Sequence, residues 1–339
     1  NVAGSHKARH LAGVMLYLQT LRAHGRLSRG RELAIASCGN AALAAATLAR
    51  ATDWPIRVFV PQTVDPHVLA RLHELGAQVV VCSRTADADG DPCYTAFIEA
   101  VENGSLPFCC QGPDNGLCIE GGQTLAYELL DQLRPSGATL DWLVIQVGGG
   151  ALASACVAGL REAVRAGVLS RMPRICTVQT TGAWPLARAY HRLVARRSTG
   201  QVPDQPNSPI LATVKNFSRE VVHELTHSPS LLQNAAQSRN QWMQPWPEPP
   251  VSVAHGILDD ETYDWFALVR AMQETGGFPL VAEEAQLVHA QQAACDFTGR
   301  PITATGAAGL AGVLELQRRG DLAPHQTVGV LVTGRQQEP

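Results

Sequence analysis

The chain has 339 residues, of which 45% are hydrophobic and 17% charged, an ordinary composition with enough length for two domains. Its net charge of −3 and pI near 6.4 exclude the strongly basic surface that nucleic acids require. No run of about 18 apolar residues occurs, which excludes a membrane-spanning helix. Nine cysteines without a CxxC pair indicate reduced thiols and a cytoplasmic protein. Because the chain opens on Asn1 instead of Met, we expect a further segment to precede it.

Short apolar runs that predict strands alternate along the chain with segments of helical periodicity. We expect strands within residues 32–36, 56–61, 77–82, 141–147, 174–180 and 327–332. We expect helices within residues 11–25, 41–54, 66–75, 124–133, 151–167, 263–277, 287–297 and 306–320. The alternation predicts an α/β fold with mainly parallel, twisted sheets flanked by helices.

Residues 196–250 interrupt this alternation. They are rich in Pro, Gln, Asn and Ser, as in GQVPDQPNSP and NQWMQPWPEPP. This composition predicts an insertion or a long loop with one or two short helices.

A glycine run follows one of the expected strands and opens a helix. Gly148, Gly150 and Ala153 fit the GxGxxA dinucleotide pattern. A nicotinamide cofactor also needs an acidic residue about 20 positions further on, and none lies between Glu162 and Asp204. A lone phosphate needs no such residue and would be held by the backbone N–H groups of the run. The alternative is a tight turn that binds nothing.

Lys7 is a second unusual residue, because arginine supplies nearly all the positive charge of the chain. Of 27 Lys and Arg residues only Lys7 and Lys215 are lysine. His6 and His10 flank Lys7 four positions apart, a spacing that allows metal binding on a helix, although we expect His6 to line or adjoin a pocket instead.

Four short motifs occur in a definite order: GSHKARH at 4–10, SCGNAA at 37–42, VGGGALAS at 147–154 and VTGR at 332–335. With this order and spacing the chain resembles the fold-type II pyridoxal-phosphate enzymes, the tryptophan synthase β-like superfamily. The segments LCIEGGQTLAYEL and TATGAAGLAGV resemble its threonine synthase and threonine dehydratase branch. The resemblance covers most of the chain outside 196–250.

The resemblance implies a role for each matching residue. It makes Lys7 the catalytic lysine that forms the Schiff base with pyridoxal 5'-phosphate, for which a primary amine is needed. It assigns binding of the substrate carboxylate to Ser37, Cys38, Gly39, Asn40 and Ala41, with Asn40 also facing the phenolic oxygen of the cofactor. It assigns binding of the cofactor phosphate to Gly148, Gly149, Gly150, Ala151 and Leu152. It places Thr333 at the pyridine nitrogen, where a hydroxyl favours elimination over transamination.

The resemblance also implies an architecture and an activity. We expect a smaller α/β domain at 1–112, a larger one at 113–339, and the cofactor in the cleft between them. The expected protein is a cytoplasmic homodimer with a small amino-acid substrate and without nucleic-acid or membrane partners. Its expected activity is that of a lyase, which removes the β-substituent of serine or threonine and releases ammonia and a 2-oxo acid.

Several features keep other activities open. His6, Ala8 and His10 stand where the family usually has Phe, Asp or Ile, and Gly. CCQGPDNGLC lacks the arginine that grips a substrate phosphate in threonine synthases, whereas VQTTGAWPL resembles the synthases. A threonine-synthase-like replacement enzyme is therefore one alternative, and a non-catalytic cofactor-binding sensor or partner subunit is another.

Two further groups of residues have simpler interpretations. Cys38 could be a redox-sensitive thiol in the substrate loop, but we expect a small packed thiol. The arginines at 188, 192, 196 and 197 could meet an anion, but we expect them to form a solvated helix face.

Overall fold

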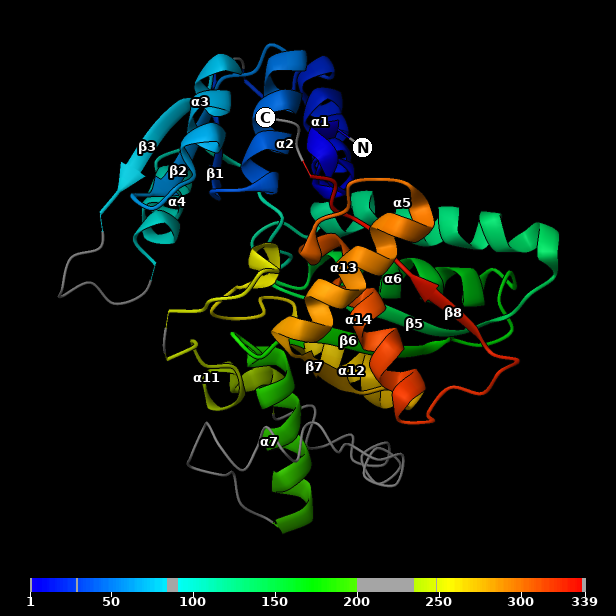
Figure 1. The fold of residues 1–339 in the computed structure, drawn as a ribbon. Coiled ribbons are helices and arrows are strands. Elements are labelled where there is room, and N and C mark those ends of the chain that lie inside the picture. Colours follow the sequence, from blue (N-terminus) through cyan, green and yellow to red (C-terminus); the bar gives the residue numbers. More distant parts are fainter. Residues whose placement is uncertain (1, 29, 84–90, 200–234, 248, 337–339) are drawn as a thin grey trace. The chain divides into compact units, whose positions relative to one another are not determined.

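The computed structural model describes residues 2–28, 30–83, 91–199, 235–247 and 249–336 (Figure 1). The chain divides into two compact units, Asn1–Thr124 and Leu125–Pro339, and each contains a four-stranded sheet. The division falls later than the boundary expected at residue 112. The domain limits, and a cofactor site between the domains, stay predictions.

The first unit alternates helices with short strands. Its elements are η1 (Val2–Gly4), α1 (Lys7–Ala23), β1 (Leu33–Ala36), α2 (Asn40–Ala51), β2 (Ile56–Pro61), α3 (Pro66–Glu74), β3 (Gln78–Cys82), α4 (Pro92–Glu102), β4 (Leu106–Pro107) and the start of α5 (Leu117–Leu133). Helices α3 and α4 begin with Pro behind a capping aspartate, which suits the first turn of a helix.

The sheet of the first unit has the order β3-β2-β1-β4, and all its strand pairs are parallel. The chain moves outward from β1 to β3 and then returns to β4 on the other side of β1. Because parallel crossovers are right-handed, this reversal puts α4 on the face opposite α2 and α3. The carboxyl end of β1 therefore lies at the switch point where open α/β sheets bind ligands.

Two glycines let α1 and α5 cross closely. A Cβ on Gly121 would lie 2.4 Å from the carbonyl oxygen of Arg9, and one on Gly13 would lie 2.9 Å from the Cα of Gly121. Gly121 belongs to the EGGQ stretch of the sequence, so helix packing requires a glycine at this position of the motif. The crossing anchors the helix that begins at Lys7.

The second unit has the same kind of alternation. Its elements are the rest of α5, η2 (Arg134–Ser136), β5 (Leu140–Gln146), α6 (Ala151–Arg165), β6 (Arg174–Thr180), α7 (Pro185–Thr199), α11 (Arg239–Trp242), η3 (His255–Ile257), α12 (Trp265–Thr275), β7 (Pro279–Ala282), α13 (Glu284–Thr298), α14 (Ala304–Arg318) and β8 (Thr327–Val330).

The sheet of the second unit has the order β7-β6-β5-β8 and is also parallel throughout. Helix α14 packs across all four strands and α13 packs on α14, while α6, α7 and α12 pack on the sheet from their own crossovers (Figure 1). The direction of travel reverses between β7 and β8, so the switch point lies between β5 and β8. Both strands lead from there into motifs singled out in the sequence.

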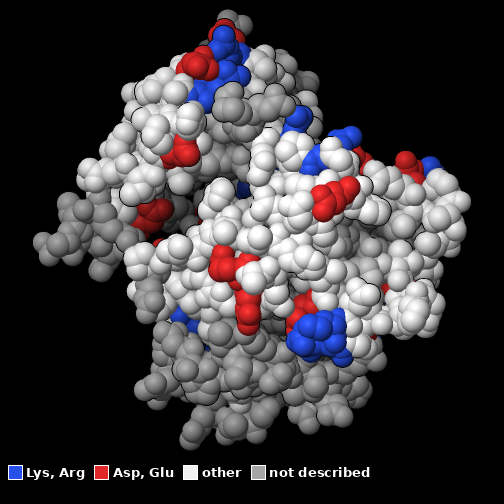
Figure 2. Space-filling view, viewed as in Figure 1, with Lys and Arg blue, Asp and Glu red and all other residues white. Residues whose placement is uncertain are grey.

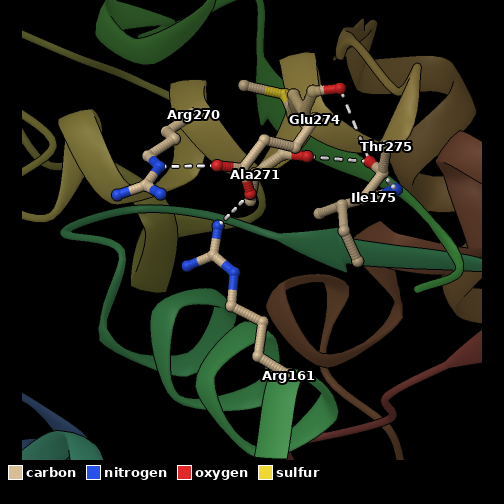
Figure 3. A network of polar contacts seen from close by, with 7 residues as sticks. Arg161, Ile175, Arg270, Ala271, Glu274 and Thr275 are labelled. Carbon is tan, nitrogen blue, oxygen red and sulfur yellow. Dashed lines mark hydrogen bonds and ion pairs between the residues drawn. The ribbon is translucent and has the colours of Figure 1, made fainter. Parts of the chain in front are cut away.

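Helix α12 is tied to α6 and β6 by a polar network (Figure 3). Glu274 accepts from Arg161 of α6 at 2.6 Å and from Arg270, one turn earlier on α12, at 2.6 Å. The hydroxyl of Thr275 accepts from the backbone N–H of Ile175 at 3.0 Å and donates to the carbonyl of Ala271 at 2.8 Å. The network holds α12 in place, and with it the end of the segment 257–264 that directly precedes this helix.

The expected α/β fold with two parallel sheets flanked by helices is confirmed. Most of the predicted insertion at 196–250 lies outside the described residues, and the part described contains the short helix α11. None of the helices in the described ranges has the length and hydropathy to cross a membrane. On the face in Figure 2, basic and acidic side chains are scattered in small groups of both signs.

Candidate functional site

Lys7 is the first residue of α1 and follows a tight turn. Ala3 and Gly4 in η1 have positive φ angles of 53° and 70°, and the Ser5 hydroxyl lies 3.4 Å from the backbone N–H of Lys7. The turn directs the chain into the helix at Lys7, whose side chain is partly exposed and hence accessible.

Residues 37–41 link the carboxyl end of β1 to α2. Gly39 is the N-cap of α2, and Asn40 is its first residue. The first N–H groups of a helix have no acceptor within it, and they carry the positive end of the helix dipole. Cys38 and Asn40 are exposed, so the expectation that Cys38 is packed is wrong. The loop is an accessible place for a carboxylate.

The structure brings Lys7 and this loop into one neighbourhood. The turn η1, which leads into Lys7, packs against α2, and α1 packs against α2 as well. Lys7 and the loop therefore belong to adjoining elements of the first unit.

His6 and His10 are one helical turn apart, with ring centroids separated by 5.4 Å. The Nδ1 of His10 lies 2.8 Å from the carbonyl oxygen of Cys118, which can only accept, so Nδ1 carries the proton. Burial and the charge of Lys7 lower the pKa of His10 to about 4. Burial, followed by the charges of Lys7, His10 and Arg9, also lowers the pKa of His6 well below its usual value.

Both histidines are therefore neutral near pH 7. Within the described ranges, no group of three or more His, Cys, Asp or Glu side chains is placed to hold a metal ion. The metal alternative gains no support there.

The glycine run lies between β5 and α6, and a later segment covers it. A Cβ on Gly148 would lie 2.1 Å from Oδ2 of Asp259, one on Gly149 2.9 Å from the ring of Tyr263, and one on Gly150 2.9 Å from Cβ of Asp264. Gly150 also has a φ of 103°, which side chains rarely adopt. Glycine is thus required at all three positions.

The carbonyl groups of the run are held by the same segment. The Thr262 hydroxyl donates to the carbonyl of Gly148 at 2.9 Å, and the backbone N–H of Asp264 donates to that of Gly149 at 3.0 Å. The two carbonyl groups are thus already hydrogen-bonded. Helix α6 begins at Ala151, and the backbone N–H groups at its start are the donors that can bind an anion. These residues fit a phosphate group.

Thr333 follows β8 at the other side of the same switch point, and Gln146 ends β5. The Gln146 amide donates to the carbonyl of Leu331 at 3.0 Å and to the hydroxyl of Thr333 at 2.7 Å. A carbonyl only accepts, so the amide nitrogen must lie on this side. Thr333 is 7% exposed, and its hydroxyl oxygen accepts the hydrogen bond from Gln146, so it does not need its own proton for that contact. The hydroxyl is thereby left to donate to a ligand, such as an unprotonated ring nitrogen.

Sequence reasoning missed Gln146 and the cover formed by residues 257–264. Gln146 is a single polar residue at the end of an apolar strand, which is a weak signal. The stretch LDDETYD had a clearer one, since it is a polar run immediately before a helix.

The predicted residues thus fall into two groups, each in its own unit. Lys7 and residues 37–41 belong to the first unit, while the glycine run and Thr333 belong to the second. Residues 37–41, the glycine run and Thr333 each follow the carboxyl end of a parallel strand, which is the edge at which open α/β sheets bind ligands.

Comparisons with known proteins give a consistent result. A family model described as "Pyridoxal-phosphate dependent enzyme" matches residues 1–224. The chain is 31% identical over 150 residues to an L-serine dehydratase of Saccharomyces cerevisiae, covering 43% of each chain. It is 34% identical over 165 residues to a serine dehydratase-like protein of Rattus norvegicus, covering 48% of this chain and 44% of that one. The matches thus span less than half the length of these curated relatives.

The solved structures agree at the level of the fold. A serine racemase from Dictyostelium discoideum superposes with a TM-score of 0.66 and 17% identity, over 99% of this chain and 84% of that chain.

Proposed function

The chain belongs to the family of pyridoxal-phosphate dependent enzymes, and on this premise we propose that it is a lyase acting on serine or threonine. The net reaction converts serine into pyruvate and ammonia, or threonine into 2-oxobutyrate and ammonia. The observation that carries the proposal is the Thr333 hydroxyl, aligned as a donor by Gln146 in the same unit as the glycine run. The serine dehydratases among the relatives support the same substrate class.

The proposal assigns the cofactor to named residues. The amine of Lys7 holds its carbonyl carbon, residues 148–152 bind its phosphate through backbone N–H groups, and Thr333 donates to its ring nitrogen. Bound pyridoxal phosphate supplies an electron sink for negative charge at the substrate Cα. Because a hydroxyl does not protonate the ring as a carboxylic acid would, it favours elimination.

The substrate side of the proposal lies in the first unit. The N–H groups at the start of α2, with Ser37 and Asn40, bind the substrate carboxylate and orient its Cα–H bond. The Nζ of Lys7 takes the Cα proton. The neutral state of His6 and His10 avoids two further positive charges beside the lysine amine.

We also propose a cytoplasmic location and a homodimer. The structure describes all nine cysteines, and none of them is in a disulfide bond, as is usual in a reducing compartment. Leu16 and Tyr17 of α1 are 65% and 47% exposed, so a dimer contact that covers them would remove apolar surface from water. Light scattering on the purified protein measures the oligomeric state.

A substrate screen tests the function. L-serine, L-threonine, O-phospho-L-serine and O-phospho-L-homoserine are each incubated with the enzyme, and keto acid, ammonia and phosphate are measured together. We expect equal amounts of keto acid and ammonia from serine or threonine, and none with Lys7→Ala. Phosphate release with threonine as product would instead identify a replacement enzyme. No product from any substrate, despite bound cofactor, would identify a sensor or partner subunit.

A further inference from the structure

Helix α7 buries two arginines on one face. Arg188 is 2% and Arg192 5% exposed, and residues four apart on a helix are neighbours. The expectation of a solvated face is therefore wrong for this pair, because the segment around α11 packs beside α7 (Figure 1). Arg196, one turn further on, is exposed, as expected, and the side chain of Arg197 lies outside the described part of the chain.

The described contacts of Arg188 are all with neutral groups. Its guanidinium donates to the carbonyls of Gln244 and Pro245, and it lies over the ring of Trp246 at 4.9 Å from the ring centre. Its Nε is buried and has no hydrogen-bond partner in the described ranges. Burial, and then the charge of Arg192, lowers the pKa of Arg188 to about 10, against an opposing effect of Glu261.

Arg192 has still fewer contacts. Its Nε and Nη1 are buried without a hydrogen-bond partner among the residues that the structure describes. Burial lowers its pKa, and among the described residues no carboxylate offsets this effect. Glu261, the acid that acts on Arg188, is already in an ion pair with Arg239. The pKa of the neighbouring His191 is lowered by burial and by the charge of Arg192, and a histidine cannot supply the negative charge that the arginines lack.

Two buried guanidinium groups without a carboxylate of their own are strongly unfavourable. Arginine keeps its proton at any pH the protein meets, so the pair cannot relieve the repulsion by deprotonation. The cost of removing such a charge from water is offset only by a paired, hydrogen-bonded anion. The planar fork of guanidinium donors matches the oxygens of a phosphate or a carboxylate.

We propose that Arg188 and Arg192 form a binding site for a small oxyanion, a phosphate or carboxylate group of a soluble metabolite. The site lies on α7 and uses none of the residues assigned to the cofactor or the amino-acid substrate. It stands whether or not the proposed reaction is correct. An anion there ties α7 to the 244–246 segment and hence stabilises this part of the second unit.

Binding and stability measurements test the site on the full chain with its cofactor. Calorimetric titrations with inorganic phosphate and with succinate, in Tris chloride free of oxyanions, distinguish the two anion classes. We expect saturable binding of at least one, weakened at least about tenfold in Arg192→Met and unchanged in the exposed control Arg196→Met. Binding of phosphate to the glycine run would persist in Arg192→Met, which distinguishes it from binding to the two arginines.

The melting temperatures provide the second arm. Without oxyanion, Arg192→Met should melt at or above the wild-type temperature, because an unpaired buried charge has been removed. With saturating oxyanion, the wild type should melt at the higher temperature. Equal binding in both proteins, binding of neither anion, or the same loss of stability in Arg192→Met with and without anion would each overturn the proposal. Arg192→Gln provides a second variant if Arg192→Met does not fold.

Discussion

Thr333 and Gln146 are 187 positions apart in the sequence, and one hydrogen bond joins them. A motif at a strand end was sufficient to single out Thr333. Gln146 could not be found in this way, because its role depends on the neighbouring parallel strand. Its Oε1 is buried without a partner in the described ranges and lies where a Cβ on Gly309 would come within 2.9 Å. Leaving this oxygen without a hydrogen bond costs free energy of folding. The bond that the amide nitrogen donates to Thr333 gives a functional reason for keeping a glutamine here.

Gln146→Met should alter the reaction more than the fold. The variant keeps the volume but removes the donor, so the Thr333 hydroxyl is free to rotate. We expect elimination to slow by roughly tenfold, the equivalent of about one hydrogen bond, and the share of transamination to rise. Keto acid and transaminated cofactor are measured together. The control is Gln326→Met, which removes the acceptor of the Trp142 indole in the same unit. An unchanged ratio of elimination to transamination in Gln146→Met would show that Gln146 has no role in the reaction.

The glycine run shows what can be predicted at the scale of an element. A strand, three glycines and a helix predicted the turn and its anion-binding side. The cover by residues 257–264 was not predicted, since it comes from more than 100 residues away. The same holds for the network around Glu274, because partners on α6 and β6 leave no mark in the sequence of α12.

Gly150→Ala separates crowding from backbone strain. Gly150 and Gly104 both have a φ of 103°, but only Gly150 has neighbours within 4 Å of an added Cβ. The positive φ should cost each alanine variant about 1–2 kcal/mol. Gly150→Ala should lose more stability and also cofactor, as measured by urea unfolding and by absorbance of the bound cofactor. Equal losses of stability in the two variants, both with full cofactor content, would contradict the close packing of residues 257–264 on the glycine run.

The Glu274 network predicts a pH-dependent stability. Burial alone would raise the pKa of Glu274, but the hydrogen bonds and charges of Arg270 and Arg161 outweigh it and lower the pKa. The contribution is therefore present above the unfolded pKa and lost as pH falls through the lower folded value. Because Glu274 is partly exposed, Glu274→Gln should cost at most about 1 kcal/mol at pH 7. The difference from wild type should vanish as pH falls below about 4. A difference independent of pH would show that charge is not its source.

At the scale of the whole molecule, both sheets place a central strand beside one that returns from the far edge. The alternation of apolar runs predicted parallel α/β sheets, and this is confirmed. The strand orders were not predicted, since pairing between β5 and β8 joins segments nearly 190 residues apart. The division into compact units after Thr124 falls inside α5, a continuous helix with no composition shift, so the sequence offers no signal for it there.

The nine thiols report on the whole fold. Cys38 is exposed, six others are buried, and burial raises the pKa of Cys109, Cys156 and Cys176 to about 12. We expect Cys38 to give the fastest reaction with a thiol reagent near pH 8, and the buried thiols to react only on unfolding. Cys38→Ser should abolish the fast phase. A fast phase that survives in Cys38→Ser would show that another thiol is accessible.

Reduction with borohydride followed by peptide mass spectrometry tests the role of Lys7 most directly. The chain has two lysines, Lys7 and Lys215, so the assignment is a choice between two side chains. We predict that reduction fixes one cofactor per chain on the peptide that contains Lys7, and that Lys7→Ala retains no reducible adduct. Lys215→Ala should leave the adduct in place. A cofactor fixed on Lys215, or an adduct that persists in Lys7→Ala, would contradict the assignment of Lys7 and with it the proposed reaction.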